Sequence, residues 1–202
     1  MTAIRLIVGL GNPGPEHELD RHNAGFWYVE ALARLHGGSW RRESRFHGEA
    51  ARVTIGGAEA WLLKPSTYMN RSGQSVSALA RFYKVAVGEL LVVHDELDLP
   101  PGTIKLKRGG GSGGHNGLKD ITAAMGGADY WRLRIGIGHP RDLYPGREVV
   151  DFVLQRPSRA EQQAIDDRMP AALDIVPMLV DGQWERAGQS LHTVPRATPK
   201  AS

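Results

Sequence analysis

Residues 90–120 constrain the fold of this chain more than any other stretch of its sequence. They begin with an uninterrupted apolar run, residues 90–93, which is typical of a strand buried on both faces of a sheet. The acidic sequence HDELD follows at once, and a Gly-rich segment then leads into a helical pattern. In open α/β sheets the groups that act on ligands lie beyond the carboxyl ends of the strands, so this stretch predicts a functional site.

The rest of the chain alternates between strand and helix patterns, which predicts an α/β protein. We expect a single domain, residues 1–192, with a mixed, mostly parallel central sheet flanked by helices on both faces. A hairpin is predicted around Gly56 and Gly57. Residues 193–202 contain two prolines and few apolar residues, which predicts a disordered tail.

Composition excludes several classes of protein. The chain has no cysteine, so disulfides, thiolate nucleophiles and cysteine metal sites are ruled out. We find no signal peptide and no run of about twenty apolar residues, and we therefore expect a cytoplasmic protein without a membrane partner. The net charge of +3 permits an anionic partner but does not require one.

The first predicted strand, residues 3–8, runs into GLGNPG, which matches the G-x-G-x-x-G fingerprint of dinucleotide-binding sites. A nicotinamide-dependent oxidoreductase would need a helix to open inside this glycine run. Pro13 and Pro15 interrupt the run and a polar segment follows, so a loop that redirects the chain is the better interpretation. Asn12 lies at the tip of that loop and is the side chain that stands out there.

Asp95 lies at the end of the buried strand, where a carboxylate could orient a catalytic histidine. His94 cannot be its partner, because neighbouring side chains of an extended segment point to opposite faces. The partner must come from elsewhere, and His22, His115 and His139 are the candidates. His22 precedes a predicted helix, where a capping or surface role is more common than a catalytic one.

A divalent cation is the alternative use of the acidic cluster, with Asp95, Glu96 and Asp98 as oxygen ligands. The leucines that alternate with them argue that the three carboxylates do not converge, and we expect no metal and no other cofactor. No G-x-S-x-G elbow supplies a nucleophile. The remaining chemistry is hydrolysis by water that a histidine activates.

Basic residues alternate with apolar ones in two predicted strands. This pattern places Lys105 and Lys107 together on the outer face of one strand, and Arg132 and Arg134 together on the outer face of the other. Paired cations on two strands would suit a phosphate backbone. A solvated protein face explains them equally well.

Four further residues lie in loops before predicted helices. Asn70 and Asn116 could be helix N-caps, or their amides could bind a carbonyl and stabilise an oxyanion. Tyr68 and Met69 are expected to be exposed, and they could contact the apolar part of a substrate.

Six strings in the chain closely resemble the bacterial-type peptidyl-tRNA hydrolases. In chain order they are GLGNPG, RHNAGF, KPSTYMNRSG, HDELDLPPG, KLKRGGGSGGHNGLKDI and RLRIGIGHP. The likeness runs from about residue 4 to residue 191. It implies hydrolysis of the ester between a peptide and the 3′-terminal ribose of tRNA, by a single α/β domain.

The resemblance implies roles for individual residues. His22 would be the general base that activates water, Asp95 would hold its tautomer, and Asn12 would recognise the peptide. The further positions that it assigns to substrate or tRNA are Tyr68, Met69, Asn70, Asn116, His115, Lys105, Lys107 and Arg134.

The chain departs from the family pattern at two positions near the first loop. His17 stands where the family usually has tyrosine, and Asp20 where it usually has threonine. We expect His17 to contact substrate by stacking or hydrogen bonding. A non-catalytic RNA-binding relative could dispense with His22 or Asp95, and the presence of both favours an enzyme. We expect a monomer, because no strong exposed apolar stripe is evident.

Overall fold

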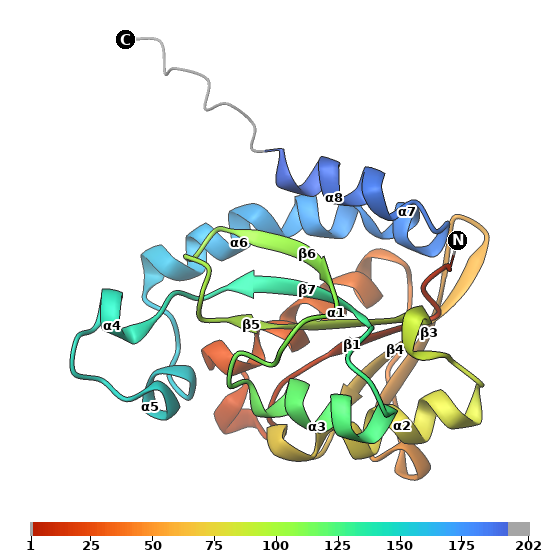
Figure 1. Cartoon of the computed structure of the whole chain (residues 1–202), viewed down its shortest axis with the longest axis horizontal. Coiled ribbons are helices and arrows are strands. Elements are labelled where there is room, and N and C mark those ends of the chain that lie inside the picture. The colour runs from red at the N-terminus through yellow and green to blue at the C-terminus, as the bar shows by residue number, and fades with distance from the viewer. Residues whose placement is uncertain (1, 194–202) are drawn as a thin grey trace, which may run out of the picture.

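A seven-stranded sheet lies at the centre of the computed structural model, which describes residues 2–193 (Figure 1). The strand order is β2-β3-β4-β1-β5-β7-β6. The strands are β1 (Leu6–Gly9), β2 (Arg41–Glu43), β3 (Gly48–Ile55), β4 (Ala58–Pro65), β5 (Leu90–Glu96), β6 (Ile104–Arg108) and β7 (Trp131–Gly136). The helices are α1 (Ala24–Leu35), α2 (Ser72–Phe82), α3 (Asn116–Met125), α4 (Pro140–Leu143), α5 (Val149–Val153), α6 (Arg159–Asp174), α7 (Val176–Val180) and α8 (Trp184–His192).

The four central strands, β4, β1, β5 and β7, run parallel to one another. The outer strands pair antiparallel: β3 with β4, β2 with β3, and β6 with β7. The β3–β4 hairpin turns at Gly56 and Gly57 as predicted, and both have the positive φ that favours glycine. A mixed sheet with helices on both faces confirms the predicted fold class. The prediction that the sheet is mostly parallel is wrong: in the described sheet three strand pairs are parallel and three are antiparallel, because the outer strands join through antiparallel pairs.

The apolar run of β5 divides between two cores because successive side chains point to opposite faces. Leu91 and Val93 pack in a core that includes residues of α1, α6, α7 and α8. Leu90 and Val92 pack in the other core, against α2 and α3. All four are fully buried, which confirms the prediction of a strand covered on both faces. Such a strand holds its carboxyl end, where Asp95 lies, in a fixed position.

The start of α1 lies directly against the backbone of the central strands because it carries glycine there. A Cβ on Gly25 would lie 2.3 Å from the carbonyl oxygen of Val93 and 2.5 Å from the amide nitrogen of Leu10. A Cβ on Gly9 would in turn meet the carbonyl of Gly25 at 2.3 Å. These distances leave room for glycine alone. The close approach brings the 3₁₀ turn η2 (Arg21–Asn23), just before α1, to the end of β5.

The capping role that the sequence left open for Asn70 and Asn116 is not found for either residue. His115, not Asn116, is the N-cap of α3. Asn70 lies inside the 3₁₀ turn η4 (Met69–Arg71), so it does not cap α2 either. Asn116 lies one position after the N-cap of α3, and Asn70 lies inside the turn that precedes α2. The predicted tail falls, apart from Thr193, outside the described residues.

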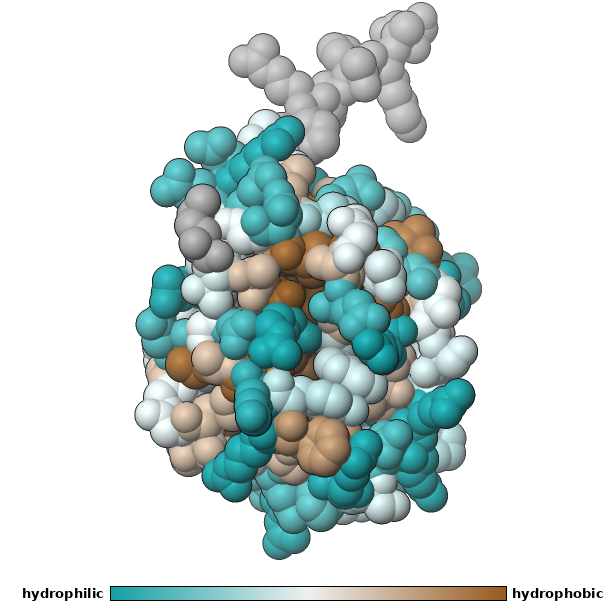
Figure 2. Space-filling view, turned by 90° about the vertical axis from the view of Figure 1, so that its right-hand side faces the viewer, coloured by the Kyte–Doolittle hydropathy of each residue, from teal (hydrophilic) through white to brown (hydrophobic). Residues whose placement is uncertain are grey.

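The two ends of the parallel strands differ in their surroundings. The carboxyl end of β7 leads to α4 and α5, on the left of Figure 1. Figure 2 shows the opposite end, where hydrophilic side chains cover most of the surface and apolar ones show in the hollows between them. Within residues 2–193, no helix is long and apolar enough to cross a membrane.

Candidate active site

A cavity of about 440 Å³ opens beyond the carboxyl end of β5. Its walls come from the loop after β1, the turns η2 and η4, the end of β5, the Gly-rich loop before α3, and α5. The lining residues are Asn12, His22, Tyr68, Met69, Asn70, Asp95, Glu96, Leu97, Ser112, Gly113, Gly114, His115, Asn116, Val149, Val150, Val153 and Leu154. The cavity lies at the end of the buried strand, where the sequence predicts a functional site.

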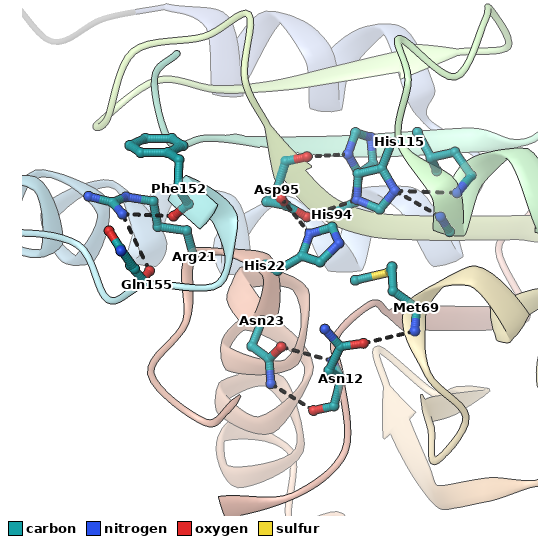
Figure 3. A network of polar contacts seen from close by, with 12 residues as sticks. Asn12, Arg21, His22, Asn23, Met69, His94, Asp95, His115, Phe152 and Gln155 are labelled. Atoms are coloured by element: carbon teal, nitrogen blue, oxygen red, sulfur yellow. Dashed lines mark hydrogen bonds and ion pairs between the residues drawn. The ribbon is translucent and has the colours of Figure 1, made fainter. Parts of the chain in front are cut away.

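Asp95 lies at the floor of this cavity with its carboxylate almost fully buried. His22 donates from Nδ1 to Asp95 Oδ2 at 2.8 Å (Figure 3). Because Nδ1 carries the proton, the lone pair of the ring lies at Nε2. His94 points the other way, and its Nδ1 donates to the main-chain oxygen of Asp95 at 2.8 Å. The expectation that Asp95 takes its histidine from elsewhere in the chain is confirmed.

A second histidine binds the same carboxylate. His115 Nε2 lies 2.8 Å from Asp95 Oδ1, so the two oxygens of Asp95 serve two histidines (Figure 3). The rings of His22 and His115 are 5.1 Å apart, centroid to centroid. His139, the third candidate, does not reach Asp95: it caps α4 by accepting from the amide of Arg141.

Burial and neighbouring charges shift the pKa values of His22 and Asp95 in opposite directions. Burial of His22 disfavours its protonated ring, but the charge of Asp95, its hydrogen bond and the charge of Asp20 together raise the pKa of His22. Burial of Asp95 alone would raise its pKa. The interactions with His22 and His115 outweigh burial and hold the pKa of Asp95 well below its usual range. Asp95 is therefore ionised throughout the range in which His22 changes charge.

His94 lies beside the pair but takes no part in it. Its burial and the neighbouring His115 lower the pKa of His94 to about 4, so this ring is neutral at physiological pH. Its ring centroid lies 5.2 Å from that of His115. His94 therefore packs edge-on against the ring of His115.

Asn12 is held in the cavity wall by three hydrogen bonds. Its side-chain Oδ1 accepts from the amide of Met69 at 2.8 Å. Its main chain exchanges two bonds with the side chain of Asn23, at 2.8 and 3.0 Å. With Oδ1 occupied, the Nδ2 group is the part of the side chain that remains to meet a ligand (Figure 3). Asn23 was not among the residues predicted for the site, although it directly follows His22.

The loop that carries Asn12 redirects the chain, as expected. It leads into a single 3₁₀ turn, η1 (Pro15–His17), and no α-helix opens within the glycine run. The arrangement that a dinucleotide pyrophosphate needs at a helix N-terminus is therefore missing from this loop.

The apolar walls of the cavity lie on opposite sides of His22. On one side, next to the exposed Asn70, Tyr68 is 63% exposed as predicted. The prediction that Met69 is exposed is wrong, because its side chain packs into the core that α2 and α3 share. The other wall is α5 with its flanking residue Leu154, and Val150 is 61% exposed there. This second wall was not predicted from the sequence. The signal that could have found it is the segment at residues 149–154, which is apolar except for Asp151 and lies in a polar stretch.

The basic residues divide into exposed and buried ones. Lys105 and Lys107 are exposed on β6, as predicted. Arg134 lies opposite Lys105 in the β6–β7 register and donates from Nε to Glu96 Oε1 at 2.8 Å. The expectation that Arg132 is an exposed cation beside Arg134 is wrong, since it is 3% exposed.

Arg132 is buried because the Gly-rich loop folds over its strand. Its guanidinium donates to the carbonyl oxygens of Gly111 and Gly110 at 2.6 and 2.7 Å. Alternation along a strand gives the face of a side chain, but it does not say whether a loop will cover that face. Arg132 thus holds the loop that precedes His115.

His17 does not line the cavity. It lies in η1, and its Nδ1 is 2.8 Å from Asp20 Oδ2. The two positions at which the sequence departs from the family pattern are therefore in contact with each other.

One group of side chains within residues 2–193 has the spacing of a metal site. His22, Asp95 and His115 offer ligand atoms within 4.8 Å of one another. Those atoms already bind each other, since both oxygens of Asp95 accept from the rings. The acidic residues proposed as an alternative do not converge: Asp95 binds the histidines, whereas Glu96 binds Arg134.

The chain matches, over residues 6–200, the model of a family described as Peptidyl-tRNA hydrolase. The chain belongs to this family. It is 57% identical over 198 residues to a peptidyl-tRNA hydrolase of Cupriavidus pinatubonensis, covering 96% of this chain and 100% of that one. It is 58% identical to one of Cupriavidus metallidurans, covering 94% and 98%.

Solved structures of the family have the same fold. A crystal structure of peptidyl-tRNA hydrolase from Acinetobacter baumannii superposes with a TM-score of 0.91 at 47% identity, covering 98% of each chain. A complex of peptidyl-tRNA hydrolase with N-propanol gives a TM-score of 0.90 at 47% identity, covering 96% of this chain and 97% of that one. The resemblance found in the motifs is confirmed, and the chain is a hydrolase whose family acts in translation.

Proposed function

We propose that this enzyme cleaves the ester between a peptide, or an N-blocked aminoacyl group, and the 3′-terminal ribose of tRNA, using water that His22 activates. The observation that carries the proposal is the 2.8 Å hydrogen bond from His22 Nδ1 to the buried carboxylate of Asp95 at the cavity floor. This bond leaves Nε2 as the basic atom of the ring. A histidine held in this way by a carboxylate is the arrangement that general-base catalysis requires.

Water is the nucleophile in this proposal. His22 Nε2 takes a proton from water as its oxygen attacks the ester carbonyl, and the carboxylate of Asp95 stabilises the imidazolium that forms. The bond from the acyl carbon to the ribose oxygen then breaks, and the imidazolium returns the proton to that oxygen. The products are a free carboxylic acid and a tRNA with an intact 3′-terminal ribose.

Asparagine amides are suited to the charge that develops on the carbonyl oxygen. Asn12 offers Nδ2 to the cavity because its Oδ1 accepts from the amide of Met69. We assign Asn12 to the peptide next to the scissile ester, and Asn70 and Asn116 to the substrate near the same bond. All three line the cavity that holds His22.

The two ends of the substrate have different surroundings. The peptide is assigned to the apolar walls, formed by Tyr68 and Met69 on one side and by α5 on the other. The tRNA acceptor stem and its CCA end are assigned to the side of β6 and β7. Lys105 and Lys107 are exposed there, and Arg134 lies beside them. Exposed cations on a strand can neutralise phosphates of a nucleic-acid backbone.

We assign His17 only an indirect effect on the substrate, because its ring binds Asp20 and does not line the cavity. We further propose that the enzyme works as a monomer in the cytoplasm, where the released tRNA returns to translation.

The proposal is tested by following the oxygen of water. N-acetyl-aminoacyl-tRNA is hydrolysed in ¹⁸O-enriched water within a single turnover, and the acid and the tRNA are analysed separately. We expect one labelled oxygen in the acid, an unlabelled tRNA, and full recharging of that tRNA by its synthetase. Cleavage within the RNA, or a released tRNA that cannot be recharged, would overturn the proposal.

A further inference from the structure

Both ring nitrogens of His115 are bound within the protein. Nε2 lies 2.8 Å from Asp95 Oδ1. Nδ1 accepts from the main-chain amides of Gly117 at 3.1 Å and Leu118 at 3.4 Å, which makes His115 the side-chain cap of α3 (Figure 3). A histidine in this position joins the first turn of a helix to a catalytic carboxylate.

These partners fix the tautomer of the ring. A main-chain N–H can only donate, so Nδ1 of His115 must carry a lone pair. The carboxylate of Asp95 is ionised and can only accept, so Nε2 must carry the proton. His115 is therefore in the neutral Nε2–H form. Protonating Nδ1 would break both bonds to α3 and would place a cation at the positive end of the helix.

We propose that His115 is a positioning residue that fixes the carboxylate of Asp95, so that Oδ2 accepts from His22. This inference rests on the proposed function of His22 and Asp95 and adds a third residue to them. The His115 N–H occupies one oxygen of Asp95, which prevents the carboxylate from rotating. The remaining oxygen faces His22, and the proton of His22 stays on Nδ1.

The geometry of His115 argues against the contact with tRNA that the resemblance implied for this residue. The side chain of His115 is 9% exposed, and neither ring nitrogen is left to meet a phosphate or a base. The rings of His22 and His94 also pack against His115, with centroids 5.1 and 5.2 Å from its own. The exposed residue at this helix terminus is its neighbour, Asn116.

The charged groups around His22 and Asp95 determine how the loss of His115 changes the pH dependence of kcat/KM. His22 faces the carboxylate of Asp95 from β5, the ring of His115 from the start of α3, and the charge of Asp20 from its own loop. Glu96 also lines the cavity, but its charge is balanced by Arg134. The cavity-lining part of α5 brings only apolar side chains.

Without the N–H of His115, less of the negative charge on Asp95 is neutralised by a hydrogen bond, and the carboxylate acts more strongly on His22. The protonated ring of His22 is then more stable, and the acid limb of the kcat/KM profile moves to higher pH. The carboxylate of Asp95 is also less well oriented, which lowers kcat by about tenfold. This is the lower end of the losses found when a residue that orients a ligand in a functional site is removed.

The test uses His115→Asn, because asparagine is a good N-cap but is too short to reach Asp95. The matched control is His139→Asn, which replaces a histidine that caps α4 in the same way without contacting Asp95. Each variant is compared with wild type for kcat, KM and the acid limb of kcat/KM on N-acetyl-aminoacyl-tRNA, and for Tm. We expect only His115→Asn to lower kcat and raise the acid limb, with KM within about threefold of wild type.

A spectroscopic measurement tests the tautomer independently of activity. In ¹⁵N NMR of the wild-type protein at neutral pH, the resonances lost in His115→Asn are expected to show a pyrrole-like Nε2 and a pyridine-like Nδ1, as the contacts of the two nitrogens require. A protonated ring or the Nδ1–H tautomer would overturn the inference even if the enzyme is active. An increase in KM with unchanged kcat and acid limb would overturn it as well, and would assign His115 to tRNA.

Discussion

Replacing Asp95 with asparagine should reverse the tautomer of His22. The asparagine side chain offers one accepting oxygen and one donating amide in place of two accepting oxygens. His115 can only donate from Nε2, because its Nδ1 accepts from the first turn of α3. The oxygen of the new amide therefore faces His115, and its NH₂ group faces His22. His22 must then carry its proton on Nε2, where no lone pair is left to accept a proton from water.

The magnitude follows from the loss of the base. In serine proteases the corresponding Asp→Asn change leaves the geometry intact and lowers kcat about 10⁴-fold. We expect Asp95→Asn to lower kcat between about 10³- and about 10⁴-fold, which is roughly 4 to 5.5 kcal/mol of barrier. The assay is single-turnover hydrolysis of N-acetyl-aminoacyl-tRNA, with tRNA affinity and Tm measured alongside. An Asp95→Asn enzyme within tenfold of wild type would refute the reasoning.

A second substitution separates the tautomer effect from a general loss of charge. In the double variant Asp95→Asn/His115→Asn, the amide at position 95 is no longer fixed by His115. Its oxygen can turn toward His22, whose proton returns to Nδ1. The double variant should therefore be more active than Asp95→Asn alone. Equal or lower activity would show that charge, rather than orientation, explains the effect.

Three further predictions concern the surroundings of the pair. Asp20→Asn removes a charge that raises the pKa of His22, so the acid limb of kcat/KM should move to lower pH in a pH–rate profile. Lys105→Ala should weaken tRNA binding and reduce the slope of log K against log salt by about one, as measured in a salt titration. Gly25→Ala introduces a Cβ 2.3 Å from the carbonyl oxygen of Val93 and should lower the free energy of unfolding by about 1–3 kcal/mol, as measured by denaturant titration.

Each of these predictions has a control within the chain. Gly88→Ala adds a Cβ that meets nothing within 4 Å, so a loss equal to that of Gly25→Ala would argue against the close approach at α1. Arg34→Ala removes an exposed cation from α1, and an equal change in salt slope would show that Lys105 has no special place in tRNA binding. An acid limb that stays in place in Asp20→Asn would mean that Asp20 does not act on His22.

The parts of the fold that depend on local pattern were predictable. The apolar run of β5 gave a strand buried on both faces, since alternate residues enter the two cores. The same alternation placed Lys105 and Lys107 outward and showed that His94 and Asp95 could not pair through their side chains. These predictions needed only the period of a strand.

The parts that depend on distant packing were not predictable. Three histidines were candidates for Asp95, and two of them bind it, because α1 packs against the strands at Gly25 and α3 begins beside the end of β5. Arg132 has the outward face that alternation gives, but the Gly-rich loop covers it. The wall formed by α5 also depends on how that helix folds back over His22.

The most direct test of the account compares wild type with His22→Ala in the presence of a metal chelator. Hydrolysis of N-acetyl-aminoacyl-tRNA and binding of uncharged tRNA are measured on the same preparations. We predict that wild type cleaves the ester in chelator, that His22→Ala loses at least about 10³-fold in kcat, and that its tRNA affinity stays within a few-fold of wild type. Cleavage by His22→Ala within about tenfold of wild type, or cleavage by wild type that chelator abolishes, would contradict the claim that His22 activates water without a metal ion.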